Sequence, residues 1–414
     1  MMIIFFNYFI FCSYYSIHLE RKKVNKSRII SKNIFSYKEK QKFTDLSLTY
    51  FSYCYCGHIY VETFEEWKRF TINFDTGSSM LWLPSEKCIG CPNNNRYNPK
   101  NFLYSRNLNK RHHISYADKT NVNGTIYSDI ISLSPSKSFT AENFEFLNVE
   151  YGEKLDEKYD GIMGLGIEKE SFSFIETLYK QNIIQSPSFS FFLFDNINSS
   201  RLYVGDILNN AYISYLFKCK IKQCFVDKKY LKWYCNLNKT SFYSQDNTNL
   251  ILFDTGANFN FIPKLYFDDL VNHLKYKMNK NVKEDNEYLF CQCKDKGSFG
   301  NIILYFNEEN EYIINLDDII KKIEKNILEE FLAFLSFWKV DYDCFFKIAK
   351  YKGNHWTIGI DSLKKSFISF NMDERKISFV QNIKEIINNK KIENSYWINK
   401  NHILYKLFNF FDIF

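Results

Sequence analysis

The chain contains 414 residues, which is enough for two lobes or one large domain with an ample hydrophobic core. Hydrophobic residues make up 45% of the sequence and charged residues 24%, as in a soluble globular protein. The net charge of +7 comes largely from Lys-rich stretches near the two ends rather than from one basic face. Because no RNA-binding or helix-turn-helix signature is present, nucleic acid is not expected as a partner.

The first 17 residues, MMIIFFNYFIFCSYYSI, carry no charge, which is typical of a signal peptide core or a short membrane anchor. This stretch lacks a basic n-region and a small-residue cleavage site. We expect it to send the chain into the secretory pathway, and we expect any membrane association to depend on it. Residues 18–52 are polar and basic, as in a removable pro-segment whose cations face an acidic site.

The sequence contains eleven Cys, and removal of Cys12 with the leader leaves an even number, which indicates disulfides in a secretory context. Cys88 and Cys91, in CIGC, fit a small disulfide loop better than half of a zinc site, because no second CxxC or HxxxH stands at a useful distance. His112 and His113 are adjacent, so on a strand they point to opposite faces and make a poor metal pair. No metal site is expected.

From about residue 57, short runs rich in Phe, Tyr, Ile and Val alternate with polar turns, a pattern typical of a mostly β fold. Helical patterns are few and fall at residues 173–184, 265–278 and 316–335. The tail, residues 386–414, carries Lys, His and Asp in a short run and is too short and too polar to span a bilayer.

An internal repeat indicates the architecture. The stretch NFDTGSSMLWLP at residues 73–84 returns half a chain later as LFDTGANFNFIP at residues 252–263, with Phe, Asp, Thr, Gly and Pro at identical offsets. Each copy is followed by a second echo, DGIMGLG at residues 160–166 and HWTIGID at residues 355–361. Two DTG tripeptides in matched apolar frames predict a duplicated β lobe.

The repeat predicts a pair of carboxylates. Gly after Asp-Thr permits a tight turn that presents a carboxylate at its tip, and two such turns related by a pseudo-twofold axis bring Asp75 and Asp254 side by side. Like charges this close share one proton, which gives one acid and one base at the same point. A water between them can lose a proton to the ionised Asp while the protonated Asp hydrogen-bonds a scissile carbonyl. No cofactor or nucleophilic side chain is required.

With these motifs the chain resembles the pepsin-type aspartic proteases over about residues 55–382, and its composition and CIGC loop resemble the plasmepsin branch. The resemblance implies a bilobal fold with a cleft between lobes at residues 53–195 and 196–385. It also implies that polypeptides are the substrates, that pepstatin-type compounds inhibit, and that the chain is a monomer. The chain would be secreted or reside in an acidic vacuole or organelle.

The resemblance assigns roles to residues of both repeats. Asp75 and Asp254 correspond to the catalytic pair, and residues 113–124 resemble the flap hairpin that closes over substrate. Further positions match the family in the dyad turns (Thr76, Gly77, Ser78, Thr255, Gly256), in the flap and its support (Tyr116, Trp82), and in two disulfides (Cys88 with Cys91, and Cys344 with Cys291 or Cys293). The partners of Cys54, Cys56, Cys219, Cys224 and Cys235 stay open.

The chain departs from the family pattern at several positions. Ala117 stands where the flap usually has Gly, and ETFEEW at residues 62–67 replaces a GTP turn at one edge of the cleft. In the second repeat, Ala257 replaces the usual Ser or Thr and Asn258 follows it. These changes favour an alternative function, a pseudoprotease that binds peptides without cleaving them, whereas both aspartates, both threonines and the flap tyrosine favour the enzyme.

Overall fold

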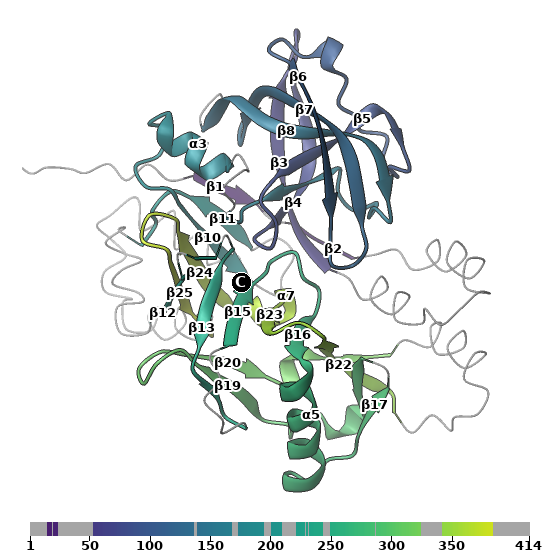
Figure 1. The fold of residues 1–414 in the computed structure, drawn as a ribbon, viewed down its shortest axis with the longest axis vertical. Coiled ribbons are helices and arrows are strands. Elements are labelled where there is room, and N and C mark those ends of the chain that lie inside the picture. The colour runs from purple at the N-terminus through teal and green to yellow at the C-terminus, as the bar shows by residue number, and fades with distance from the viewer. Residues whose placement is uncertain are drawn as a thin grey trace, which may run out of the picture.

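The computed structural model describes residues 15–18, 20–23, 53–135, 139–167, 173–193, 200–208, 221–227, 229–230, 232–242, 249–285, 287–323 and 342–383. Within these ranges the chain forms an upper and a lower β lobe with a further sheet between them (Figure 1). The predicted mostly β, bilobal class is confirmed. Cys12, Cys219, most of the expected leader and pro-segment, and the 386–414 tail lie outside the described residues.

The first lobe is one sheet of eight strands in the order β2-β3-β4-β9-β5-β8-β7-β6. An additional pairing of β3 with β7 folds this sheet back on itself. In sheet order the strands are β2 (Glu20–Lys23), β3 (Tyr53–Glu62), β4 (Trp67–Asp75), β9 (Gly161–Gly164), β5 (Leu81–Ile89), β8 (Thr140–Glu153), β7 (Asn121–Ser132) and β6 (Arg106–Ser115).

The second lobe contains a larger and a smaller sheet. The larger follows the order β13 (Tyr234–Leu237), β15 (Asn249–Phe253), β23 (His355–Ile358), β16 (Asn260–Pro263), β22 (Cys344–Tyr351), β18 (Tyr288–Cys291) and β17 (Val282–Asp285), with β21 (Ile320–Lys322) paired to β22. The smaller consists of β14 (Lys239–Thr240), β19 (Asn301–Tyr305) and β20 (Glu311–Asn315).

The sheet between the lobes takes strands from both ends of the chain. Its order is β1 (Tyr15–His18), β11 (Arg201–Val204), β10 (Ser188–Leu193), β24 (Ser366–Asn371), β25 (Lys376–Val380) and β12 (Lys222–Phe225). Phe189 of β10 stacks on Phe370 of β24 with ring centroids 4.9 Å apart, and Trp233 packs edge-on against Phe370 at 5.0 Å. The Trp233 indole N–H donates to the Leu165 carbonyl at 2.8 Å, so this aromatic cluster ties the second half of the chain to the first.

Helices are short, and two of the three predicted ones form. α3 (Phe174–Lys180) lies within the expected 173–184 segment, and α5 (Lys264–Asn272), extended by a π-turn at His273–Lys277, matches 265–278. Single turns are 3₁₀ at Pro99–Asn101, Cys293–Asp295 and Asp317–Ile319, and α-helical at α7 (Ile360–Leu363). Among the described residues, no helix is long and apolar enough to cross a membrane.

The helix predicted at residues 316–335 is wrong over its described part. Residues 317–319 form a 3₁₀ turn, and β21 follows at once, with Ile320 opposite Phe346 of β22. Ile319 and Ile320 are both buried, which a strand after a tight turn achieves as well as a helix. Residues 324–335 lie outside the described residues.

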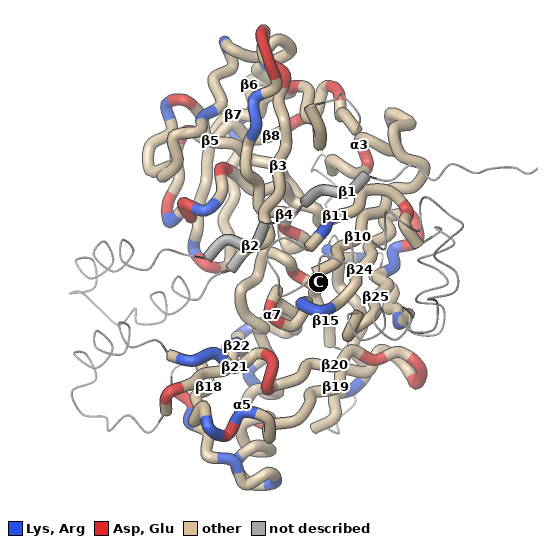
Figure 2. Tube along the Cα trace, turned by 180° about the vertical axis from the view of Figure 1, so that it is seen from behind, with Lys and Arg blue, Asp and Glu red and all other residues tan. Residues whose placement is uncertain are grey.

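Charged residues lie around both lobes with the two signs interspersed (Figure 2). Many charges are paired locally on the surface, as Arg111 is with Glu150 and Lys264 with Asp268. Exposed pairs of this kind contribute little stability, so the fold depends on its aromatic core.

Two buried tryptophans test the link between the halves. We expect Trp233→Phe to lower the free energy of unfolding by about 1–3 kcal/mol more than Trp356→Phe, because it orphans the Leu165 carbonyl. Both indoles are fully buried, but the Trp356 N–H has no hydrogen-bond partner among the described residues, so its loss orphans nothing. Urea unfolding of both variants measures the difference, and equal losses would show that the Trp233 N–H stabilises nothing.

Candidate active site

The first candidate carboxylate, Asp75, closes a strand that runs through the core. β4 buries Phe70, Ile72 and Phe74, and Asp75 itself is only 5% exposed. The Asp75 end of β4 pairs in parallel with Gly164 of β9, one of the echoes found in the sequence. Parallel pairing with β9 holds the end of β4, where Asp75 lies.

The second turn repeats this arrangement in the other lobe. β15 ends at Phe253, directly before Asp254, and Phe253 pairs in parallel with Ile358 of β23, the second echo. A Cβ on Gly359, which follows β23, would come within 2.3 Å of the Phe259 carbonyl oxygen. Each repeat thus consists of a strand, a DTG turn and a parallel neighbour whose glycine lets the chain pass closely.

Two threonines hold the two turns against each other. The Thr76 hydroxyl donates to the Phe253 carbonyl at 2.7 Å, and the Thr255 hydroxyl donates to the Phe74 carbonyl at 2.7 Å. The backbone N–H of Thr76 donates to the Thr255 hydroxyl at 3.1 Å, and the reverse bond is 3.0 Å. All these groups are buried, so the four bonds fix the turns with approximate twofold symmetry.

The DTG glycines bring the two carboxylates together. A Cβ on Gly77 would lie 2.4 Å from Asp254 Oδ2, and a Cβ on Gly256 would lie 2.3 Å from Asp75 Oδ1. Each turn therefore passes over the carboxylate of the opposite repeat, at a distance that only glycine permits. The sequence-predicted pair, Asp75 and Asp254, is brought face to face at the junction of the lobes.

The two carboxylates have different hydrogen-bond donors. Asp75 accepts from the Gly77 N–H at 2.8 Å and from the Ser78 hydroxyl. Asp254 accepts only backbone N–H groups among the described residues, from Gly256 at 2.8 Å and Ala257 at 3.1 Å. Each carboxylate thus accepts two hydrogen bonds, but only the first turn supplies one of them from a side chain.

The pKa of the Asp254 carboxyl is strongly shifted. Burial, the negative charge of Asp75 and a hydrogen bond to Asp75 together raise the pKa of the Asp254 carboxyl well above its usual range. The two backbone N–H groups lower that pKa but do not offset the rise. Burial and the neighbouring carboxylate therefore favour the protonated form of Asp254.

The predicted flap is a hairpin of β6 and β7. Tyr116 stands at its tip, where its N–H bonds the Thr120 carbonyl at 2.9 Å. The Trp82 indole N–H donates to the Tyr116 hydroxyl at 2.9 Å. Burial and the nearby charge of Asp75 raise the pKa of Tyr116, so its hydroxyl stays protonated and near the dyad. Ala117 is exposed beside it.

Three disulfides are present in the described residues. Cys88 pairs with Cys91 in the first lobe, and Cys344 pairs with Cys293 in the second. A third disulfide, Cys224–Cys235, joins β12 to β13 and was left open by the sequence.

The described residues offer little geometry for binding a metal ion. Among the described residues, the one group of His, Cys, Asp and Glu that is close enough to hold a metal is Cys293, Asp343 and Cys344. The disulfide occupies both of its sulfurs. His112 and His113 are both exposed on β6.

Sequence reasoning missed a buried polar support behind the second turn. Asn260 is fully buried, its side-chain oxygen accepts from the Gly359 N–H at 3.0 Å, and its side-chain amide donates to the Lys347 carbonyl at 3.0 Å. Its position in the repeat matches Leu81 of the first copy. The signal was this polar residue at an offset where the other repeat is apolar.

Lys347 adds a buried charge next to the same turn. Its ammonium lies 4.3 Å from the centre of the Phe259 ring and 3.9 Å from Asp361. Burial lowers the pKa of Lys347 to about 7, although Asp361 opposes the shift. Lys347 and Asp361 were not singled out from the sequence, because a single Lys within a strand pattern is usually predicted to be exposed.

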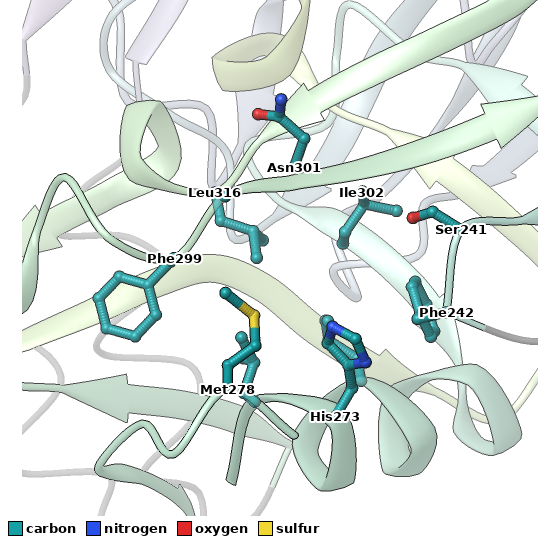
Figure 3. A pocket seen from close by; sticks show the side chains of 11 residues that line it. Ser241, Phe242, His273, Met278, Phe299, Asn301, Ile302 and Leu316 are labelled. Carbon is teal, nitrogen blue, oxygen red and sulfur yellow. The ribbon is translucent and has the colours of Figure 1, made fainter. Parts of the chain in front are cut away.

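A cavity of about 160 Å³ lies in the second lobe, between the α5 segment and the smaller sheet. Its walls include Phe242, Met278 and Phe299 beside His273 (Figure 3). It is lined by none of the sequence-predicted site residues. The candidate chemistry is at the dyad, not in this cavity.

Comparison with known proteins identifies the family of this chain. The model of the eukaryotic aspartyl protease family matches residues 54–382. Secreted aspartic protease 6 of Candida albicans is 22% identical over 76% of this chain and 73% of its own length. Gastricsin of Oryctolagus cuniculus is 24% identical over 67% and 74%, and cathepsin E-A of Xenopus laevis is 30% identical over 37% and 39%. The chain therefore belongs to the eukaryotic aspartyl protease family, as a pepsin-like aspartic endopeptidase acting on polypeptides.

Proposed function

We propose that Asp75 and Asp254 are the catalytic pair and hydrolyse peptide bonds through a water held between them. Asp75 is the base, because Ser78 and Gly77 donate to its anion, and Asp254 is the acid. Asp75 takes a proton from the water as its oxygen attacks the carbonyl carbon. Asp254 donates its proton to the carbonyl oxygen. The tetrahedral adduct then collapses, the carbonyl oxygen returns its proton to Asp254, and Asp75 passes its proton to the leaving amine nitrogen.

The observation that carries this proposal is the reciprocal approach of each DTG glycine to the opposite carboxylate. It leaves no room for a side chain between the acids, so both can reach one water. Thr76 and Thr255 position the turns, and Tyr116, held by Trp82, closes the substrate side. The finer assignment is a plasmepsin-type monomer that pepstatin-type compounds inhibit and that works at acid to mildly acid pH.

Location is proposed from the uncharged N-terminus and from the names of the secreted Candida relatives. The chain enters the secretory pathway through residues 1–17, and it is then secreted or kept in an acidic vacuole or organelle. Any membrane contact is made by this leader.

A cleavage profile tests the function. A peptide library is incubated with the protein from pH 3 to pH 7, with and without pepstatin, and products are identified by mass spectrometry. Many cuts at acid pH that pepstatin abolishes are expected. Binding of library peptides without any cut would instead favour the pseudoprotease.

Asparagine substitutions test the roles of the two aspartates. We expect Asp75→Asn and Asp254→Asn each to abolish turnover while the fold stays intact, because either amide removes the acid–base pair. Asp129→Asn is the matched control, since Asp129 is a buried carboxylate of the first lobe whose partners are Tyr97 and the Ile130 N–H. Turnover within tenfold of wild type in either dyad variant, with an unchanged circular dichroism spectrum, would contradict the mechanism.

The missing hydroxyl of the second turn sets the pH range. In Ala257→Ser, a new donor to ionised Asp254 favours loss of the proton from the proposed acid, so the basic limb of kcat/KM should move to lower pH. A hydrogen bond to a charged group contributes about 1.5–3 kcal/mol and one pKa unit is about 1.4 kcal/mol. Asn258 can supply part of this bond, so we expect a shift of up to about one unit.

Ser78→Ala is the counterpart in the first turn, and it should move the acid limb upward. The pH dependence of kcat/KM is measured for both variants beside the wild type. A basic limb that stays in place in well-folded Ala257→Ser would show that the missing hydroxyl does not set the pKa of Asp254.

Residues 18–52 are proposed to be removed on activation. β2 (Glu20–Lys23) is the edge strand of the first-lobe sheet, and β1 (Tyr15–His18) is the edge strand of the sheet between the lobes, so both can leave without breaking a strand order. N-terminal sequencing of the active form should find a start near residue 53. An active chain that begins well before residue 50 would count against removal.

A further inference from the structure

Two cysteines that the proposed function does not use lie side by side on β3. Their sulfur atoms, Cys54 Sγ and Cys56 Sγ, are 2.9 Å apart. Residues two apart on a strand share one face of the sheet, so the geometry follows from the sequence Cys-Tyr-Cys. Both side chains are buried, with exposed fractions of 7% for Cys54 and 1% for Cys56.

This thiol pair occupies a defined place in the first lobe. Cys56 is paired with Asn73 of β4, two residues before Asp75. On the other side of β3, Cys54 and Cys56 pair in the ladder with Lys22 and Glu20 of β2. The pair therefore lies where the mature β3 strand meets the strand of the proposed pro-segment.

The remaining cysteines of the described residues show what the environment allows. Six of them form the disulfides 88–91, 224–235 and 293–344, which indicates an oxidising compartment. Cys291 is also buried, and burial raises the pKa of its thiol to about 12. Cys54 differs from Cys291 in having a second sulfur within contact.

We propose that Cys54 and Cys56 are a redox modification site that takes a reversible Cys-X-Cys disulfide. The oxidant is a small disulfide such as glutathione disulfide. The Cys54 thiolate attacks it and releases one glutathione, and the Cys56 thiolate then attacks Cys54 Sγ and releases the second. Two protein thiols are oxidised, one glutathione disulfide is reduced to two thiols, and one S–S bond replaces another.

Strand geometry makes this disulfide easier to reduce than the other three. Two residues of extended chain span about 6.6 Å, near the upper limit of about 6.8 Å for Cα atoms joined by a disulfide. Closure therefore pulls β3 out of its extended form between β2 and β4. A bond that opposes its strand has a less negative reduction potential than an unconstrained one.

The test is a redox titration of the full-length chain. The protein is equilibrated in glutathione buffers from fully reduced to fully oxidised, quenched with acid, unfolded, alkylated and digested with trypsin. The peptide of residues 43–68 contains Cys54 and Cys56 and no other cysteine. In oxidising buffer we expect this peptide to be lighter by two hydrogen atoms and closed to alkylation. Its reduction midpoint should lie at a less reducing buffer than those of the other three disulfides.

Variants identify the partner. Cys54→Ser and Cys56→Ser should each leave the other thiol alkylable in oxidising buffer, and the matched control Cys291→Ser should leave the 54–56 disulfide unchanged. Two free thiols in the wild-type peptide under oxidising conditions would overturn the proposal, as would a bond from either sulfur to a third cysteine or to glutathione. Because mass is the readout, the result does not depend on peptidase activity.

Discussion

Everything at this active site depends on the mutual hold of two turns that lie half a chain apart. Each threonine hydroxyl donates across the junction to the carbonyl just before the opposite aspartate. Buried hydroxyls and carbonyls must be satisfied, and here each turn can satisfy its own only with the other. The glycines then let the turns approach until each backbone touches the opposite carboxylate. A shared proton is the electrostatic result of that approach.

This reciprocity explains why the site could be predicted from the sequence. A DTG turn by itself is a short motif, but two copies with matched flanks and a later echo in each half require the same local structure twice. The structure pairs Asp75 with Gly164 and Phe253 with Ile358, so in each half the DTG strand lies parallel to the echo that follows it. Tyr116 and Trp82 were predicted through the family resemblance rather than through any local pattern, and they meet as expected.

What escaped prediction depends on contacts that spacing does not encode. Cys291 and Cys293 are two residues apart, and Cys291 even lies directly opposite Cys344 in the ladder. The disulfide nevertheless goes to Cys293, because Cys291 points into the core while Cys293 stands in the 3₁₀ turn beyond the strand, with its Cα 5.1 Å from that of Cys344. The helix prediction at residues 316–335 was wrong because the buried Ile319 and Ile320 fit a strand as well as a helix.

The two repeats also differ in the residues that surround their aspartates. An exactly twofold pair of aspartates would have no preferred site for its proton. Here Ser78 donates to one carboxylate and Ala257 cannot donate a side-chain bond to the other, while burial and the charge of Asp75 raise the pKa of the Asp254 carboxyl. The second turn is instead held from behind, where Asn260 replaces an apolar residue and bonds both neighbouring strands. In the proposed mechanism the first turn stabilises the anion of the base, and the second turn, which carries the acid, is supported through its backbone.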